Sequence, residues 1–463
     1  MKLKRKEKKF SEFHNVISVR TALKNGDRNT RLSAVIMGFG NLVSGQIVKG
    51  LMYLLLEIGF IFYMVMFGGG FLGGLVTLGT KTTGEVFNEE KQIYEYTAGD
   101  NSMLFLLYGI VTLFLIAAFV LLWRTAVKSA YSVQKVKEAG GKVSTIREDI
   151  RALLDKRLYG TLLAMPVLCV VVFTIMPLVF MTCMAFTNYD RNHQPPGKLF
   201  DWVGLTNFQK LFDLSGSLGY AFWHVLGWTI IWAILATALN YILGMILAIV
   251  INRKDTHWKG FWRFIFVLSI AVPQFVSLLI MRTMLQEQGA INVLLQNIGL
   301  IREPLPFWTN TMWARVTVIV VNLWVGIPFT LLQVTGILQN IPQELYESAK
   351  VDGANAVVTF FKITLPYMLF VTTPYLITQF IGNINNFNVI YLLTEGKPAA
   401  MDYFNGTAGK TDLLVTWLYK LTVDFKDYNY AAVIGITVFV LSAFFSIFAY
   451  QHTGSYKDEE GFQ

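Results

Sequence analysis

The sequence predicts an all-α, polytopic membrane protein with eight transmembrane helices. Of its 463 residues, 54% are hydrophobic and only 15% are charged, whereas a soluble domain carries about 25% charged residues. The mean hydropathy is +0.49, and the apolar residues are gathered into blocks of about 20, the length that crosses a bilayer. Because backbone polar groups find no water in hydrocarbon, we expect each block to be helical.

Eight apolar blocks follow one another along the chain, and each is interpreted as one membrane crossing. The connections between them are polar or charged, so they are expected outside the hydrocarbon. In order, the blocks are Gly50–Phe67, Met103–Trp123, Thr161–Phe186, Val225–Ile251, Phe261–Leu285, Met312–Leu338, Tyr367–Leu393 and Tyr430–Tyr450.

The blocks divide the chain into four predicted regions. The stretch Ser33–Lys49 is apolar but rich in glycine and carries Asn41 and Gln46, so we interpret it as an interfacial or re-entrant segment. The regions are 1–49, a basic cytoplasmic N-terminus with this interfacial segment; 50–157, two additional crossings and a cytoplasmic linker; 158–451, a six-helix core that includes the connection 339–366; and 452–463, a cytoplasmic tail.

Lysine and arginine crowd alternate connections. The chain up to Arg31 holds ten of them, Arg124–Arg157 nine and Arg253–Arg263 four, whereas the intervening connections hold two, three and one. Basic connections face the cytoplasm, so both termini are predicted there. The net charge of +9 thus reflects membrane topology, and no nucleic-acid partner is expected.

The connection at 339–366 is long for a passive turn, since most such links span about two to six residues. Pro342 marks the start of a short helix with acids near its positive end, and Gly353 ends that helix. Apolar residues then recur at helical spacing in a second short helix before Pro366. We interpret this helix–turn–helix as a cytoplasmic docking surface; packing on the undersides of the other helices is the alternative.

The same connection resembles the EAA signature, E-A-A-x3-G-x9-I-x-L-P, of importer-type ATP-binding-cassette (ABC) permeases. Glu347-Ser-Ala349, Gly353 and Ile363-x-Leu365-Pro366 match it, with Ser348 in place of the first alanine. The resemblance extends over most of the chain from the third crossing onward. Val203–Phe208 looks like the G-L-x-N-F/Y segment of sugar permeases. Three further segments are similar to the maltose/maltodextrin-type large permease subunit, namely Asn322–Gly326, Asn383–Phe387 and Thr411–Val415.

The resemblance implies a type I ABC-importer core in a bacterial cell membrane. Such a permease moves a maltodextrin-type oligosaccharide by alternating access, receiving it from an extracytoplasmic binding protein. It lines the pore with a second, homologous permease, and two cytoplasmic subunits bind ATP and Mg²⁺ and hydrolyse the ATP. This chain would then be no enzyme and bind no cofactor. The implied ATPase-coupling residues are Glu344, Glu347, Ser348, Ala349, Asp352, Gly353, Ile363, Leu365 and Pro366.

Polar residues inside the apolar blocks predict an internal cavity, because such residues usually face a bundle interior or water. Side-chain amides suit sugar hydroxyls, and aromatic rings suit the apolar face of a sugar. The alternative is that the amides only cross-link helices. The resemblance implies a sugar site made of Gln274, Asn322, Trp324, Val325, Gly326, Phe329, Asn383 and Asn386.

Two other functions of a membrane protein would each require particular residues in this sequence. A proton- or ion-coupled secondary sugar transporter would use a carboxylate within the membrane, and Glu57 is the candidate, although a satisfied interhelical contact is the favoured interpretation of this residue. A membrane glycosyltransferase would need an acidic metal-binding motif on an exposed loop, and the sequence has none. Arg282 and Arg315, near outer helix ends, are expected to snorkel.

Overall fold

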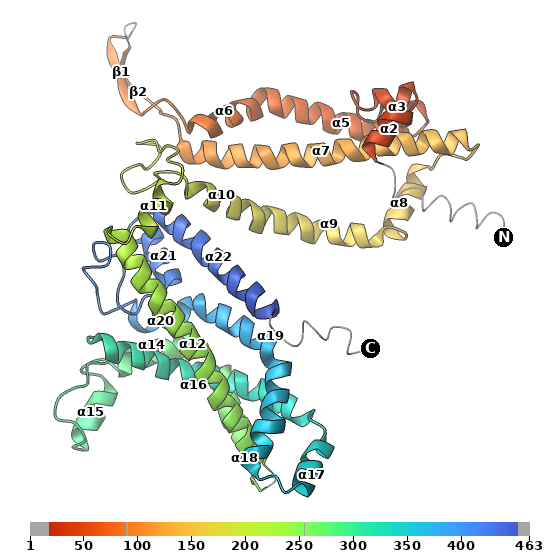
Figure 1. Ribbon diagram of the computed structural model, residues 1–463. Helices are drawn as coiled ribbons and strands as arrows, with labels where there is room; N and C mark the ends of the chain where they lie inside the picture. The colour runs from red at the N-terminus through yellow and green to blue at the C-terminus, as the bar shows by residue number, and fades with distance from the viewer. Residues whose placement is uncertain (1–17, 89–90, 254, 452–463) are drawn as a thin grey trace. The chain divides into compact units, whose positions relative to one another are not determined.

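The computed structural model describes residues 18–88, 91–253 and 255–451 (Figure 1). The described chain is helical apart from one two-stranded hairpin, so the all-α prediction is confirmed. Two compact units, Met1–Trp202 and Val203–Gln463, divide the chain. The predicted tail at 452–463 and the first 17 residues of the basic N-terminus lie outside the described residues.

Eight crossings were predicted, and within the described residues seven single helices and one bent pair fit them. The bent pair is α13 (Lys259–Ala271) and α14 (Gln274–Met284), which meet at 89°. Pro273 caps α14, and because proline has no N–H it starts a helix more readily than it continues one. The single helices span Ile47–Thr77, Ser102–Glu138, Leu158–Met184, Ser217–Asn252, Thr311–Gln339, Ala356–Thr394 and Tyr428–Gln451.

The first unit is organised on α7 (Ser102–Glu138), against which the N-terminal helices pack. Ala22, Val127 and Tyr131 form a buried cluster there. The remaining elements are α2 (Val19–Asn25), α3 (Arg28–Leu32), α4 (Phe39–Val43), α5 (Ile47–Tyr63), η1 (Met64–Gly68), α6 (Gly69–Thr77), β1 (Gly84–Asn88), β2 (Ile93–Thr97), α8 (Ile146–Leu154), α9 (Leu158–Val170), η2 (Val171–Ile175) and α10 (Met176–Met184).

Residues 33–46 fold into turns and the five-residue helix α4, which is too short to cross a bilayer. Helix α5 begins directly afterwards, at Ile47. The interfacial position of Ser33–Lys49 stays a prediction, as do the four proposed regions of the chain.

In the second unit the long helix α12 (Ser217–Asn252) packs along α16 (Thr311–Gln339) and α19 (Leu365–Ile384). The other elements are α11 (Thr206–Phe212), α13, α14, α15 (Ala290–Asn297), α17 (Gln343–Val351), α18 (Ala356–Thr359), η3 (Phe360–Thr364), α20 (Phe387–Thr394), α21 (Leu414–Val423) and α22 (Tyr428–Gln451).

Two apolar clusters hold these helices together. The loop-side cluster includes Trp232, Leu278, Val318, Ile390 and Leu413. The α17-side cluster includes Met245, Leu331, Val334, Ile341 and Met368. Helices α12, α16 and the α19–α20 segment contribute residues to both clusters. The helix bundle is therefore packed together at two separate levels.

The second short helix expected at 357–365 is not a separate element. Helix α18, the π-turn η3 and α19 follow one another without a break, so this stretch is the start of the seventh crossing. Pro366 directly follows the π-turn η3, and within this continuous helix its missing N–H removes one backbone hydrogen bond. The helix–turn–helix itself is present, formed by α17 and this long helix.

Candidate functional site

A cavity of about 460 Å³ lies among α12, α14, α16 and α19, at the level between the two apolar clusters. Along α12, for example, it touches the residues between Trp232 of one cluster and Met245 of the other. The lining residues are Ala236, Thr237, Asn240, Tyr241, Gln274, Asn322, Val325, Gly326, Phe329, Thr330, Leu332, Gln333, Tyr375, Leu376, Gln379, Asn383 and Asn386.

Seven of the eight residues predicted for the sugar site line this cavity, and Trp324 is the exception. Positions 322, 325, 326 and 329 repeat at the spacing of one helix face. Trp324 falls on a different face of α16 and is 55% exposed. The cavity is also lined by Thr237, Asn240 and Gln333, which the prediction omitted. Each is a polar residue within an otherwise apolar block, and this is the sequence feature that could have identified them.

Two amide atoms in the lining have no hydrogen-bond partner within the described part of the chain. They are Nδ2 of Asn322, a residue only 3% exposed, and Oδ1 of Asn240. A buried polar group left unsatisfied costs about 1–3 kcal/mol. Both residues line the cavity, but the two unpaired atoms are themselves shielded from solvent, so a polar ligand would pair with them only if the amides turned toward the cavity.

Asn383 and Asn386 were expected on one helix face, but the helix breaks between them. Helix α19 ends at Ile384, and Asn386 caps α20 by accepting a hydrogen bond from the Val389 N–H. The two amides still meet, because Nδ2 of Asn386 donates to Oδ1 of Asn383 at 3.3 Å. Nδ2 of Asn383 donates in turn to Oγ1 of Thr237 at 2.9 Å, which ties the pair to α12.

The lining sets amide and hydroxyl groups among apolar side chains and carries no charge: the described residues that form it include no Asp, Glu, Lys, Arg or His. Two helices also begin at the cavity, since Gln274 is the first residue of α14 and Asn386 caps α20. The first N–H groups of a helix have no partner within that helix. The site therefore combines amide groups with backbone donors and suits a neutral, hydroxyl-rich ligand.

Glu57 has a local partner in the first unit. Its Oε2 accepts a hydrogen bond from the Met37 N–H at 2.7 Å, and it is not among the residues that line the cavity. Glu57 is therefore hydrogen-bonded, but to the backbone of a preceding turn and not, as predicted, across a helix–helix interface.

The turn between α17 and α18 depends on Gly353. Its φ is +75°, a left-handed conformation that glycine adopts without the steric penalty of a Cβ. A Cβ at this position would meet nothing within 4 Å, so backbone conformation alone explains the glycine. Ala354 N–H then donates to the Ala349 carbonyl at 2.9 Å and closes the helix end.

Helix α17 is anchored on one side and open on the other. Ile341, just before it, is buried in the α17-side cluster, and the Tyr346 hydroxyl lies 3.1 Å from Oγ1 of Thr364. Leu365 packs against the same cluster, and Pro366 is exposed.

Glu344, Glu347 and Ser348 are exposed on the open side of α17. A groove of about 490 Å³ lies beside them, between α17 and α18. Five predicted coupling residues line it, namely Ser348, Ala349, Asp352, Gly353 and Ile363.

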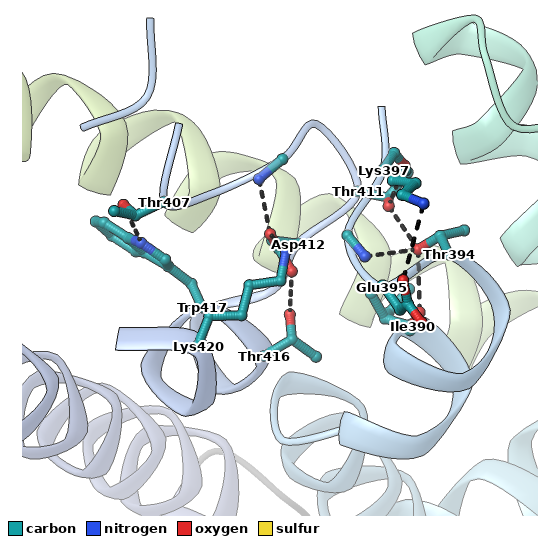
Figure 2. Close-up of polar contacts among 12 residues, drawn as sticks. Ile390, Thr394, Glu395, Lys397, Thr407, Thr411, Asp412, Thr416, Trp417 and Lys420 are labelled. Atoms are coloured by element: carbon teal, nitrogen blue, oxygen red, sulfur yellow. Dashed lines mark hydrogen bonds and ion pairs between the residues drawn. The ribbon is translucent and has the colours of Figure 1, made fainter. Parts of the chain in front are cut away.

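The loop between α20 and α21, residues 395–413, is built around a buried carboxylate (Figure 2). Asp412 is 0% exposed. It accepts hydrogen bonds from Gly409 N–H at 2.7 Å, Thr416 Oγ1 at 2.8 Å and Lys420 Nζ at 2.6 Å. Burial raises the pKa of the Asp412 carboxyl, and the Lys420 ammonium opposes that rise. Gly396 packs so closely on this carboxylate that a Cβ there would overlap it.

The same loop binds two arginines that were expected to snorkel. Arg282 of α14 donates to Oε1 of Glu395 at 2.8 Å, and this hydrogen bond holds the pKa of Glu395 below its ordinary value. Arg315 of α16 donates to the Lys410 carbonyl at 3.0 Å and lies over the Trp228 ring. The snorkelling prediction is therefore wrong: both side chains tie helix ends to the loop.

Known proteins resemble this chain closely. Residues 240–453 match the family model "Binding-protein-dependent transport system inner membrane component". The galactooligosaccharides transport system permease protein GanP of Bacillus subtilis is 35% identical over 437 residues, covering 92% of this chain and 98% of that protein. The chain belongs to this family of ABC sugar-importer permeases. The maltodextrin transport system permease protein MdxF of Bacillus subtilis is 34% identical over 441 residues, 94% and 97% of the two chains.

The fold agrees with that family. A bacterial ABC transporter solved in complex with an alginate pentasaccharide-bound periplasmic protein has a chain of the same fold, with a TM-score of 0.52 and 24% identity over 66% of this chain and 96% of that chain. The resemblance drawn from the EAA signature is thus confirmed. The chain is a transport subunit, and the comparisons give no support to a secondary transporter.

Gly326→Ala tests the geometry of the cavity. A Cβ at Gly326 would overlap the Asn240 amide and push it out of the lining, so we expect the apparent substrate affinity in an uptake assay to fall about tenfold, or about 1.4 kcal/mol. Gly336→Ala, on the same helix with nothing within 4 Å of the new Cβ, is the control. Equal affinity in the two variants would contradict the expectation.

Asp412→Asn tests the buried ion pair. The change leaves the Lys420 ammonium, 15% exposed, without its counter-charge, so we expect a loss of about 3–5 kcal/mol in the free energy of unfolding. Denaturant unfolding of the purified protein measures it. Asp402→Asn, which breaks the more exposed pair with Lys410, should cost about 1 kcal/mol or less. A similar loss in both variants would refute a special role for Asp412.

Proposed function

We propose that the chain is one permease half of an importer for neutral oligosaccharides of the maltodextrin type. The observation that carries this proposal is the uncharged, amide-rich cavity. An acidic sugar would lose its hydration there without gaining a counter-ion, which is costly in a low-dielectric site. The functions of the relatives, galactooligosaccharide and maltodextrin transport, agree with a neutral substrate.

The lining residues have the chemistry that a sugar requires. Each amide offers donors and acceptors to hydroxyl groups, and Phe329 and Tyr375 offer ring faces to the apolar side of a pyranose. If the Asn240 and Asn322 amides turn toward the cavity, their unpaired atoms would gain the missing hydrogen bonds from the sugar. The cavity volume lies in the range of about 300–1,000 Å³ that is usual for small-molecule sites.

In the proposed mechanism this chain works with several partners. An extracytoplasmic binding protein delivers the sugar, and a second permease completes the pore. Two ATPase subunits bind ATP and Mg²⁺, and they contact α17 on the cytoplasmic side of the membrane. Glu344 and Glu347, both exposed, pair with basic groups on the ATPase. Both termini lie in the cytoplasm of a bacterial cell, and alternating access moves the sugar.

The substrate assignment is tested by uptake into proteoliposomes that hold the complete transporter and its binding protein. We expect malto-oligosaccharides to be transported and uronic-acid oligosaccharides of equal length to be excluded, because the lining has no cation to balance a carboxylate. Preference for galacto-oligosaccharides would revise the sugar but keep the neutral class. Uptake of the uronic-acid series at a comparable rate would refute the proposal.

The Asn383→Ala, Asn386→Ala double variant tests the amide pair in the same assay. Loss of these hydrogen-bonding groups should lower uptake at least about tenfold, which corresponds to about 1.4 kcal/mol. Asn385→Ala is the matched control, since Asn385 lies in the same helix break but is exposed and does not line the cavity. An unchanged uptake rate in the double variant would remove these residues from the site.

Gly353→Val tests the coupling turn. A β-branched residue at φ +75° is strained by roughly 1–2 kcal/mol, so α17 should lose its orientation. We expect sugar-stimulated ATP hydrolysis by the complete transporter to fall severalfold while the amount of permease in the membrane stays normal. Gly140→Val is the control, because Gly140 also has a positive φ and nothing within 4 Å but ends α7 instead. Normal coupling in Gly353→Val would contradict the proposed lever.

A further inference from the structure

Helix α8 (Ile146–Leu154) has a complete N-terminal capping box but no buried residue. Thr145 caps it through a reciprocal pair of hydrogen bonds with Glu148. Its apolar side chains are exposed and, at about 100° per residue, they share one side of the helix. They are Ile146, Ile150, Leu153 and Leu154, which are 44%, 50%, 46% and 62% exposed.

The charged residues of this segment divide into two groups. The acids within α8 are used by the protein: Glu148 belongs to the cap, and Asp149 contacts Ser144 Oγ at 2.8 Å and Lys49 Nζ at 3.6 Å. Asp155, which ends α8, is exposed and has no side-chain partner among the described residues. The basic group has no ion pair with any residue that the structure describes. It consists of Arg147 and Arg151 on α8 and of Lys156 and Arg157 just after it.

The arrangement around the helix axis matches a membrane surface. At about 100° per residue, Arg147 and Arg151 lie next to the apolar side, on the flank away from Asp149. Long arginine side chains beside an apolar stripe can reach lipid headgroups while the stripe enters the acyl region. Clustered basic residues attract anionic lipids in the same position.

The position in the chain brings α8 to that surface. Only Asp155, Lys156 and Arg157 separate it from α9 (Leu158–Val170), the start of a crossing with a mean hydropathy of 2.7. Three residues span at most about 11 Å, so the end of α8 cannot leave the vicinity of the bilayer. The Lys49 and Ser144 contacts of Asp149 fix which side of α8 faces the protein.

We propose that α8 lies in the plane of the membrane surface and binds anionic phospholipid. Ile146, Ile150 and Leu154 enter the acyl region, and Arg147 and Arg151 bind headgroup phosphates. The helix thereby fixes the point at which the third crossing enters the bilayer. This proposal depends on the membrane-spanning fold and not on the sugar assignment.

Depth quenching in lipid nanodiscs tests the orientation. The full chain carries a fluorophore on Ile150→Cys or on Ala152→Cys, in a background with Cys169→Ser and Cys183→Ser. We expect brominated acyl chains to quench the label at position 150 at least about threefold more than the label at 152, which points to the opposite side. Equal, weak quenching at both positions would overturn the proposal. So would a label at position 150 that lipid does not quench and that becomes protected from solvent only when an ATPase subunit binds.

Headgroup selectivity is tested with the label at position 150. Brominated phosphatidylglycerol should quench it at least about twofold more than brominated phosphatidylcholine, because arginine favours anionic headgroups near the surface. Arg147→Gln with Arg151→Gln should abolish this preference, whereas Arg302→Gln, an exposed arginine of another connection, should leave it intact. If both lipids quench the label equally when Arg147 and Arg151 are present, the anionic-lipid assignment is overturned.

Discussion

A polar side chain within a membrane bundle must find a partner in the protein or face a water-filled space, because the hydrocarbon offers none. Most of the polar groups in the second unit are paired, as Tyr241 is with Thr372 at 2.7 Å and Asn383 with Thr237. Four buried side-chain atoms in the described part of this unit have no partner: those of Asn240 and Asn322 belong to residues that line the cavity, whereas Arg263 Nε and Ser442 Oγ lie elsewhere. At the cavity, a polar ligand could relieve the cost of the unpaired atoms by pairing with amides that turn toward it.

The helix breaks follow from the same constraint. Irregular backbone is tolerated at membrane depth only where it faces a cavity or protein, and the helices that begin after the breaks, α14 and α20, begin at the cavity. Their other ends are joined by the Arg282–Glu395 ion pair. Since the loop that carries Glu395 is itself fixed by buried Asp412 (Figure 2), α14 and α20 are expected to move together.

Local patterns in the sequence predict much of this structure. The apolar blocks, the cavity face of α16 and the turn at Gly353 depend on spacing and on one residue's backbone preference, so they could be predicted. The 89° bend has a local signal in Pro273, whereas the α19–α20 break and the loop around Asp412 depend on contacts between distant segments. Arg282 looks like a snorkelling residue until its partner Glu395, 113 positions away, is placed beside it.

The α17-side cluster connects the two candidate sites physically. Ile341, at the start of α17, is buried with Leu331 of α16 and Met368 of α19, and both of these helices go on to line the cavity. Packed interiors repack between discrete arrangements rather than deform continuously. A force on α17 must therefore either break this cluster or carry α16 and α19 with it. In the second case the amides that line the cavity would change their spacing as α17 moves.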